Sequence, residues 1–252
     1  MKITILGCGT STGVPVIGCK CSVCRSSNPK DKRTRTSVLV IINNTNILID
    51  TSTDLRQQCL TNNIHRIDAV LFTHHHADHI HGIDELRSFN MIQKGKIPCY
   101  GNDTTIKRIQ EMFNYIFSTE EKESWTPDIE VFKVSSQFEV FGINIQPVDV
   151  MHGKLNIFGY RIGGFGYITD CSYVPDESKK LLKELDLLIL GALRQKPHPT
   201  HFSIEQAMEL AKELKPKRTV LTHLSHNIGF EETNSSFPEG VELAYDGIEI
   251  EV

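Results

Sequence analysis

The segment that most constrains the fold is T-H-H-H-A-D-H, residues 73–79, which overlaps the end of the apolar run A-V-L-F-T. This continuous apolar run predicts a buried strand over 69–73. Four histidines and one aspartate follow it within six positions. Packing so many polar side chains at the exit of a buried strand costs free energy unless a partner satisfies them, and a metal ion does so. The segment therefore predicts a metal site at the end of a buried strand.

The spacing H-x-H-x-D-H indicates two metals rather than one. If the backbone leaves the strand extended, His74 and His76 point the same way and His75 points away. A tight turn beyond Ala77 then aims Asp78 and His79 at a neighbouring point. Two ligand pairs a few ångströms apart suit two-metal hydrolysis. A solvated polar turn is the alternative, but ligand types and spacing both favour the metal site.

Three distant residues are candidates for the remaining ligands, because each follows an apolar, strand-like run: His152, Asp170 and His223. Taken alone, each could be an ordinary surface residue or a cap. Taken together they complete two sites. We expect one metal on His74, His76 and His152, a second on Asp78, His79 and His223, and Asp170 between them.

The order of predicted elements favours a single domain over residues 1–252. Strand-like runs come first and helical segments follow, and this order repeats in two halves without a Gly/Ser-rich or Pro-rich linker. The sequence predicts a hairpin from strands at 37–42 and 46–50, a polar connection at 118–128, and a strand at 219–225. Ser203 and Gln206 form a capping-box pattern that opens a helix. We expect two packed sheets with helices outside, a four-layer αββα sandwich of the α/β (α+β) class.

The charge and hydropathy of the chain exclude some partners. The net charge is −4 and the pI is about 6.3, unlike the basic footprint of a nucleic-acid binder. The opening M-K-I-T-I-L-G-C-G has too short an apolar run for a signal peptide or a membrane span. We therefore expect a cytoplasmic protein that binds neither nucleic acid nor membrane.

The ligand pattern resembles the metallo-β-lactamase superfamily: T-H-x-H-x-D-H, then a lone His, an Asp after a strand, and a His near the C-terminus. The resemblance covers essentially the whole chain and implies the αββα fold. It also implies that Asp50, at the end of N-I-L-I-D, supports the metal ligands from behind. A plain turn carboxylate is the alternative for Asp50.

A separate cysteine cluster, G-C-K-C-S-V-C, suggests a structural zinc site. A closed zinc site takes four ligands, and the cluster supplies Cys19, Cys21 and Cys24. We expect His226, three residues after His223, as the fourth ligand, so that the zinc ties the N-terminal loop to the active-site loop. Cys8 is the rival. Otherwise, we expect Cys8, Cys59, Cys99 and Cys171 to be buried free thiols.

The cysteine cluster and H-L-S-H together resemble the phosphoribosyl 1,2-cyclic phosphate phosphodiesterases of the C–P lyase pathway. The resemblance implies a phosphodiesterase that hydrolyses a small cyclic phosphodiester through hydroxide activated by two metals. It makes Asp78 a catalytic metal ligand and His201 a protonated catalytic residue that binds no metal. It implies two Zn²⁺ or Mn²⁺ ions at the active site and one structural Zn²⁺.

Two other functions stay open. An RNA 3′-processing nuclease of the same superfamily also uses two metals, but no long Gly-rich or basic arm is evident in the sequence. A non-catalytic accessory protein, similar to a pyrroloquinoline-quinone biosynthesis protein with a Cys-rich zinc site, is the second. The complete ligand sets favour catalysis on a small molecule. The sequence is compatible with a homodimer.

Overall fold

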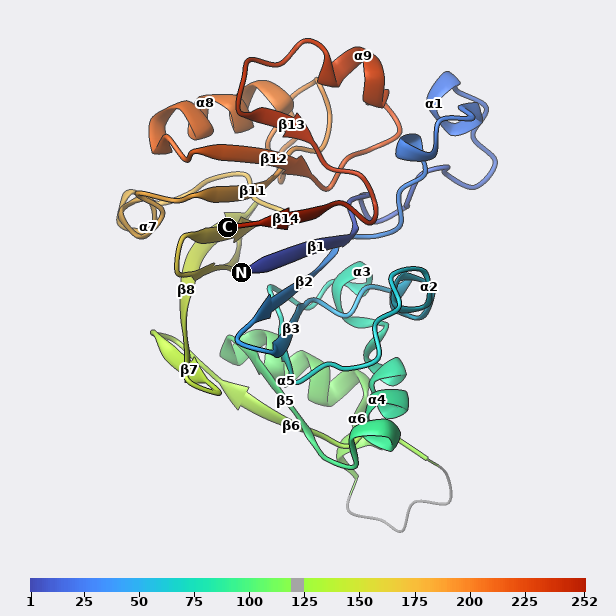
Figure 1. Cartoon of the computed structure of the whole chain (residues 1–252), viewed down its shortest axis with the longest axis vertical. Helices are drawn as coiled ribbons and strands as arrows, with labels where there is room; N and C mark the ends of the chain where they lie inside the picture. Colours follow the sequence, from blue (N-terminus) through green and yellow to red (C-terminus); the bar gives the residue numbers. More distant parts are fainter. Residues whose placement is uncertain (119–124) are drawn as a thin grey trace.

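Two mixed β-sheets pack face to face, and helices cover their outer faces. The computed structural model describes residues 1–118 and 125–252, so the connection predicted over 118–128 lies partly outside the described residues. Figure 1 shows α2 to α6 on one side of the paired sheets and α7 to α9 on the other, with the two termini close together. The predicted four-layer αββα sandwich is confirmed.

Each sheet has seven strands among the described residues. The first has the order β14-β1-β2-β3-β4-β5-β6 and the second β13-β12-β11-β10-β9-β8-β7. The strands of the first sheet are β1 (Lys2–Gly7), β2 (Ser37–Ile42), β3 (Thr45–Ile49), β4 (Ala69–Leu71), β5 (Ile97–Gly101), β6 (Ile129–Lys133) and β14 (Glu249–Glu251). Those of the second are β7 (Phe138–Val140), β8 (Ile143–His152), β9 (Leu155–Ile162), β10 (Phe165–Ile168), β11 (Leu187–Gly191), β12 (Arg218–Thr222) and β13 (Val241–Leu243).

The helices are short and lie mostly between strands. Their bounds are α1 (Ser22–Arg25), α2 (Leu55–Thr61), α3 (Ala77–Ile80), α4 (Leu86–Gln93), α5 (Asp103–Met112), α6 (Asn114–Phe117), α7 (Asp176–Leu181), α8 (Ile204–Leu214) and α9 (Phe230–Asn234), with 3₁₀ turns η1 (Pro29–Asp31) and η2 (Ile83–Glu85). The predicted capping box opens α8: the Ser203 hydroxyl accepts from the amide of Gln206, and the Gln206 side chain accepts from the amide of Ser203.

Alternation along the strands produces three layers of core. One face of each sheet points inward, where residues such as Ile5, Ile49, Tyr160 and Ile189 form the interface between the sheets. The opposite faces pack against the two groups of helices. Both sheets are thus buried on both faces, which explains the continuous apolar runs of the inner strands.

Two of the predicted strands end earlier in the structure than the sequence indicates, whereas the predicted hairpin forms. The hairpin of β2 and β3 turns through Asn43 and Asn44, which both have positive φ, as a tight two-residue turn requires. The strand predicted over 219–225 ends at Thr222 because His223 has a φ of 59° and leaves the sheet. The strand predicted over 69–73 pairs only as far as Leu71. Both strands stop where the backbone begins to present the side chains predicted as ligands.

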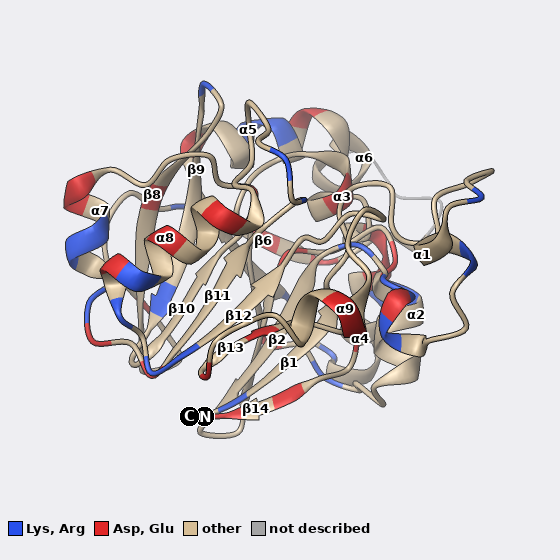
Figure 2. Ribbon diagram, turned by 90° about the horizontal axis from the view of Figure 1, so that it is seen from above, with Lys and Arg blue, Asp and Glu red and all other residues tan. Residues whose placement is uncertain are grey.

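The distribution of charge gives no continuous basic face on the helices of the second sheet. Figure 2 shows acidic and basic residues interspersed along α7 and α8. Within the described part of the chain, none of the helices combines the length and the apolarity that a membrane crossing requires.

Candidate active site

The histidine segment lies at the carboxyl end of β4, where neighbouring strands also end. β3 runs parallel to β4, and β10, β11 and β12 run parallel to one another in the other sheet. Five of the predicted residues lie at or just after the end of a strand. Asp50 follows β3, His74 follows β4, His152 is the last residue of β8, Asp170 follows β10, and His223 follows β12. Because parallel strands bring their carboxyl ends to one edge, residues far apart in the sequence meet there.

The first group of donors contains His74, His76, His152 and Asp170, whose ligand atoms all lie within 4.8 Å of one another. Nε2 of His74 is 3.0 Å from Nδ1 of His76. The ring of His152 lies 5.5 Å from that of His74 and 5.0 Å from that of His76, measured between centroids. His75 is not part of the group, as predicted.

The second group contains Asp78, His79, His223 and again Asp170, also within 4.8 Å of one another. Oδ1 of Asp170 is 3.3 Å from Nε2 of His79 and 3.1 Å from Nε2 of His223. Its Oδ2 lies 3.9 Å from Nε2 of His74, in the first group. Asp170 therefore stands between two adjacent donor sets, each of which can hold one metal.

Three of these strand-end residues have left-handed backbone conformations. The φ angles are 63° at Asp50, 49° at Asp170 and 59° at His223. This region is uncommon for residues other than glycine, although Asp and His are enriched there. A residue in such a conformation costs on the order of 1 kcal/mol or more, and the surrounding structure must impose it. Here it turns each side chain sharply from the end of a strand towards its neighbours.

Hydrogen bonds behind the donors fix the orientation of the imidazole rings. Asp50 accepts from the Thr73 amide at 2.8 Å, from the Thr73 hydroxyl at 2.8 Å and from Nδ1–H of His79 at 2.7 Å. Since the Thr73 hydroxyl donates to Asp50, it accepts from Nδ1–H of His74 at 3.0 Å. His152 donates from Nδ1 to the Thr200 carbonyl at 2.7 Å. All three rings are left with Nε2 for a metal.

The electrostatics of the cluster favour ionised carboxylates and leave several buried atoms without partners. Burial alone would raise the pKa of Asp170, but His223 and His79 hold that pKa well below its usual range. Nε2 of His79, both ring nitrogens of His223 and Oδ2 of Asp78 have no hydrogen-bond partner. Buried polar atoms without partners are costly, and a cation between them would satisfy them. The residues therefore fit a metal centre.

His201 lies beside both donor groups and belongs to neither. Its ring stacks on that of His223 at 5.0 Å and meets that of His152 edge-on at 4.6 Å. Its Nδ1 is 4.0 Å from Oδ2 of Asp170. Burial, with the charge of His223, lowers the pKa of His201 to about 3. The expected protonated form of His201 therefore does not fit this environment, which favours a neutral ring with one N–H.

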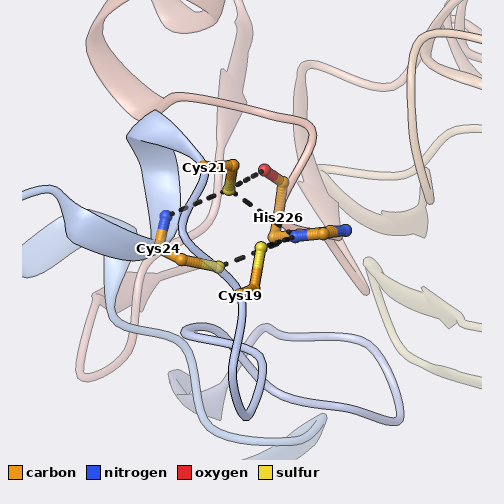
Figure 3. A group of neighbouring side chains, drawn as sticks. All are labelled: Cys19, Cys21, Cys24 and His226. Atoms are coloured by element: carbon orange, nitrogen blue, oxygen red, sulfur yellow. Dashed lines mark hydrogen bonds between the residues drawn. The ribbon is translucent and has the colours of Figure 1, made fainter.

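The cysteine cluster meets His226, as expected. Figure 3 shows the three sulfurs directed at the ring of His226, with Nδ1 at 3.2 Å from Sγ of Cys19 and 3.6 Å from Sγ of both Cys21 and Cys24. The amide of Cys24 lowers the pKa of the Cys21 thiol to about 6, which favours the thiolate that zinc binds. We call this cluster of Cys19, Cys21, Cys24 and His226 the clip.

The rival ligand, Cys8, is buried elsewhere. Its thiol faces the carbonyl of Ala244 at 3.5 Å and is not part of the clip. The three other remaining cysteines are also buried and free, as expected: Cys59, Cys99 and Cys171.

Further bonds join the loop of the clip to the loop that carries His223. Arg33 is fully buried, and its guanidinium donates to the carbonyls of Ser225 at 3.0 Å and Ile228 at 2.7 Å and to Asp31 at 3.1 Å. The amide of Leu224, next to His223, donates to the carbonyl of Cys8 at 2.8 Å. The clip is thus one of several ties between the N-terminal segment and this loop.

Asp50 lies behind the ligands, as the resemblance implied, and not in a plain turn, but sequence reasoning missed the other residues that position the ligands through hydrogen bonds. Thr73 is adjacent to the histidine run, so its position was a usable signal. The Thr200 carbonyl and the buried Arg33 gave none, because their roles depend on which loops meet in space. His198, whose ring is 5.1 Å from that of His201, was also missed, although it lies in the same H-P-T-H segment.

With this geometry established, comparison with known proteins identifies the class. The sequence model of the family described as the beta-lactamase superfamily domain matches residues 45–224, which is most of the chain. Together with the αββα fold and the paired donor groups, this match shows that the chain belongs to the metallo-β-lactamase superfamily of metal-dependent hydrolases.

A solved structure narrows the family further. The chain is 44% identical to a protein described as a new diphosphatase from the PhnP family, with a TM-score of 0.93 over 99% of this chain and 96% of that one. Within the superfamily, the chain is therefore PhnP-like. The Porphyromonas gingivalis protein named Octanoyltransferase is 38% identical over 254 residues, which cover 99% of this chain. The chain spans about half the length of the curated relatives it matches, with 51% of this one covered.

More distant structures share the fold alone. Zinc-bound PqqB from Methylobacterium extorquens is 21% identical with a TM-score of 0.80, and each chain is covered completely. The short form of human tRNase Z is also 21% identical, with a TM-score of 0.73 over 100% of this chain and 99% of that one.

Proposed function

We propose that this hydrolase cleaves a small phosphodiester, with phosphoribosyl 1,2-cyclic phosphate as the model substrate. The observation that carries the proposal is the position of Asp170, which belongs to both donor groups. A shared carboxylate defines two neighbouring cation positions, the arrangement that suits displacement at phosphorus. The similar PhnP-family structure, described as a diphosphatase, supports a phosphoryl substrate. The cyclic ribose phosphate follows from the resemblance of the cysteine cluster and H-L-S-H to the phosphoribosyl cyclic phosphate phosphodiesterases.

The donor sets suggest which metals the site would take. Imidazole suits Zn²⁺, and the carboxylates Asp78 and Asp170 leave Mn²⁺ open, while the clip suits a structural Zn²⁺. When bound, two such cations would acidify water and neutralise charge on the phosphoryl oxygens. The chain's own contribution is to hold the donors in place: Asp50 and Thr73 orient His79 and His74.

His201 would act on the substrate as a neutral N–H donor. In hydrolysis, the water oxygen forms a new bond to phosphorus, one P–O ester bond breaks, and a proton of that water passes to the leaving oxygen. Because its pKa is lowered to about 3, His201 is uncharged near pH 7. It can then stabilise a phosphoryl oxygen by a hydrogen bond. Replacing His201 by alanine should lower kcat while the metal content stays unchanged.

One second candidate has a specific observation in its favour. The similar PhnP-family structure is described as a diphosphatase, so a phosphoric anhydride bond is a reasonable alternative target. The likeness to tRNase Z and to PqqB extends to the fold alone and adds no support for the nuclease or the accessory role. The name Octanoyltransferase applies to a protein about twice as long as this chain, and the paired donor groups give it no support.

We also propose that the protein acts on a small molecule and has no nucleic-acid partner. A homodimer is a further proposal. Acidic and basic residues interspersed along α7 and α8 favour the small substrate over an RNA backbone (Figure 2). We also propose a cytoplasmic location, because neighbouring thiols that hold zinc are typical of reducing compartments.

The decisive experiment measures activity and metal content on the same sample. The substrates are 5-phosphoribosyl 1,2-cyclic phosphate, a 2′,3′-cyclic nucleotide, a nucleoside diphosphate sugar and a short tRNA precursor. We expect turnover of the cyclic ribose phosphate with about three metals per chain, two at the centre and one in the clip. A full metal complement without cleavage of the cyclic ribose phosphate would refute the proposal. Cleavage of the diphosphate alone would favour the second candidate.

A further inference from the structure

At the ends of β4, β10 and β12, a threonine directly precedes a residue of the donor groups: Thr73, Thr169 and Thr222. All three side chains are fully buried. The Thr73 hydroxyl bonds to the ring of His74, and the Thr169 hydroxyl donates to Oδ1 of Asp170 at 2.7 Å. The Thr222 hydroxyl has no hydrogen-bond partner among the described residues. Thr169 therefore acts on the one carboxylate that both donor groups share.

The backbone around Asp170 is braced, but the rotation of its carboxylate is not. At Gly191, β11 comes so close that a Cβ there would lie 3.1 Å from the amide nitrogen of Asp170. The torsion that turns an aspartate carboxylate has broad preferences, so a fixed backbone does not set it. In the described part of the chain, the Thr169 hydroxyl is the only hydrogen-bond donor to this carboxylate apart from imidazoles. Asp50, by contrast, accepts from three donors.

The rotation of this carboxylate decides which oxygen faces which donor group. Oδ1, the atom that Thr169 holds, lies 3.3 Å from Nε2 of His79 and 3.1 Å from Nε2 of His223, in the second group. Oδ2 then faces the first group, 3.9 Å from Nε2 of His74. A carboxylate that turned about its Cβ–Cγ bond would move both oxygens at once. One hydroxyl thus fixes one oxygen for each of the two cation positions.

We propose that Thr169 is a positioning residue, which holds the carboxylate of Asp170 with one oxygen towards each donor group. The cation of the second group should depend on it most, because the oxygen that Thr169 holds is the one beside His79 and His223. This inference rests on the metal centre of the proposed function and goes beyond it by naming the residue that sets how the shared ligand is divided. It does not depend on which phosphoryl compound is the substrate.

Two substitutions at this position separate the hydroxyl from the packing of the side chain. Thr169→Val keeps the branched shape and removes the donor, whereas Thr169→Ser keeps the donor. Titration of the full chain with zinc under a competing chelator measures both active-site affinities and that of the clip. We expect Thr169→Val to lower the affinity for one active-site zinc by about 10–100-fold, as is typical when a partner that orients a ligand is lost. Thr169→Ser should bind zinc as the wild type does.

The matched control is Thr222→Val, at a buried threonine that also precedes a donor residue but makes no hydrogen bond to it. It should keep the wild-type affinity for both active-site zincs. Wild-type affinity in Thr169→Val would overturn the proposal. So would an equal loss in Thr169→Ser or Thr222→Val, or a simultaneous loss of zinc from the clip, because each would indicate a packing role. A wild type that binds no zinc at the centre would refute the proposed function and this inference with it.

Discussion

The two donor clusters of this protein are supported in different ways. The residues of the paired donor groups are mostly buried at strand ends, and side chains such as Asp50 and Thr73 hold them by hydrogen bonds. The clip lies on a four-residue helix and two loops, and its sulfurs accept from backbone amides: Val16 to Cys24 at 3.3 Å and Cys24 to Cys21 at 3.4 Å. One site is built by the core, and the other lies outside it.

This difference in support suggests that the two clusters have different roles. Around the paired donor groups the fold imposes left-handed backbone at Asp50, Asp170 and His223, which sets the direction of these side chains. In the clip, three cysteines meet a histidine that is more than 200 positions away in the sequence, beside other bonds that join the same two loops. We therefore expect the first site to supply chemistry and the second to stabilise the loop that carries His223.

The largest effect should follow from replacing Asp170, which both donor groups share. Asp170→Ala removes a ligand from each group, together with the carboxylate oxygen that lies 3.3 Å from Nε2 of His79 and 3.1 Å from Nε2 of His223. We expect kcat/KM to fall by at least about 10³-fold and both active-site metals to be lost, while the clip keeps its zinc. Steady-state kinetics and metal analysis measure this. Asp176→Ala, at an exposed carboxylate, is the matched control, and an active Asp170→Ala enzyme would contradict the assignment.

A smaller loss should follow from disturbing the residue behind the ligands. Asp50→Asn keeps the size of the side chain but cannot accept from all three donors that Asp50 satisfies. Because such supporting partners orient the ligands, we expect metal affinity to fall by about 10–100-fold. Titration with zinc under a competing chelator measures it. The clip serves as the internal control: a parallel loss of its zinc would mean that the variant is misfolded.

Much of this centre could be predicted from the sequence because strand ends and ligand spacing are local signals. The run from His74 to His79, and single residues such as His152 and His223 after apolar strands, indicated both the fold and the donors. Of the residues behind the ligands, only Asp50 was indicated by the sequence; the Thr200 carbonyl and Arg33 could not be predicted, because they act through loop contacts with no local pattern. The lowered pKa of His201 could not be predicted either, since burial and neighbouring rings are properties of the folded site.

Removing the clip should separate its structural role from chemistry. In the double variant Cys21→Ser and Cys24→Ser we expect the loss of one zinc per chain and a kcat/KM reduced by no more than about tenfold. The reason is that Arg33 and the Cys8 carbonyl still hold the loop of His223. Metal content, kinetics and thermal unfolding of the same sample test this. Loss of all three metals would show that the dinuclear centre depends on the clip.

The smallest expected effect concerns the chemical reactivity of the thiols, which should differ between Cys21 of the clip and the buried cysteines. Since the thiolate is the reactive form, Cys21, with its pKa lowered to about 6, should react with iodoacetamide rapidly at pH 8 once zinc is chelated. Its labelling rate should fall as the pH drops through about 6, where the thiol becomes protonated. Burial raises the pKa of Cys59 and of Cys171 to about 12, so both should stay unlabelled. Peptide mass spectrometry measures each site, and zinc added before the reagent should protect Cys21. Labelling of Cys59 or Cys171 before Cys21 would contradict the assignment, because it would place the accessible thiolate in the core instead of the clip.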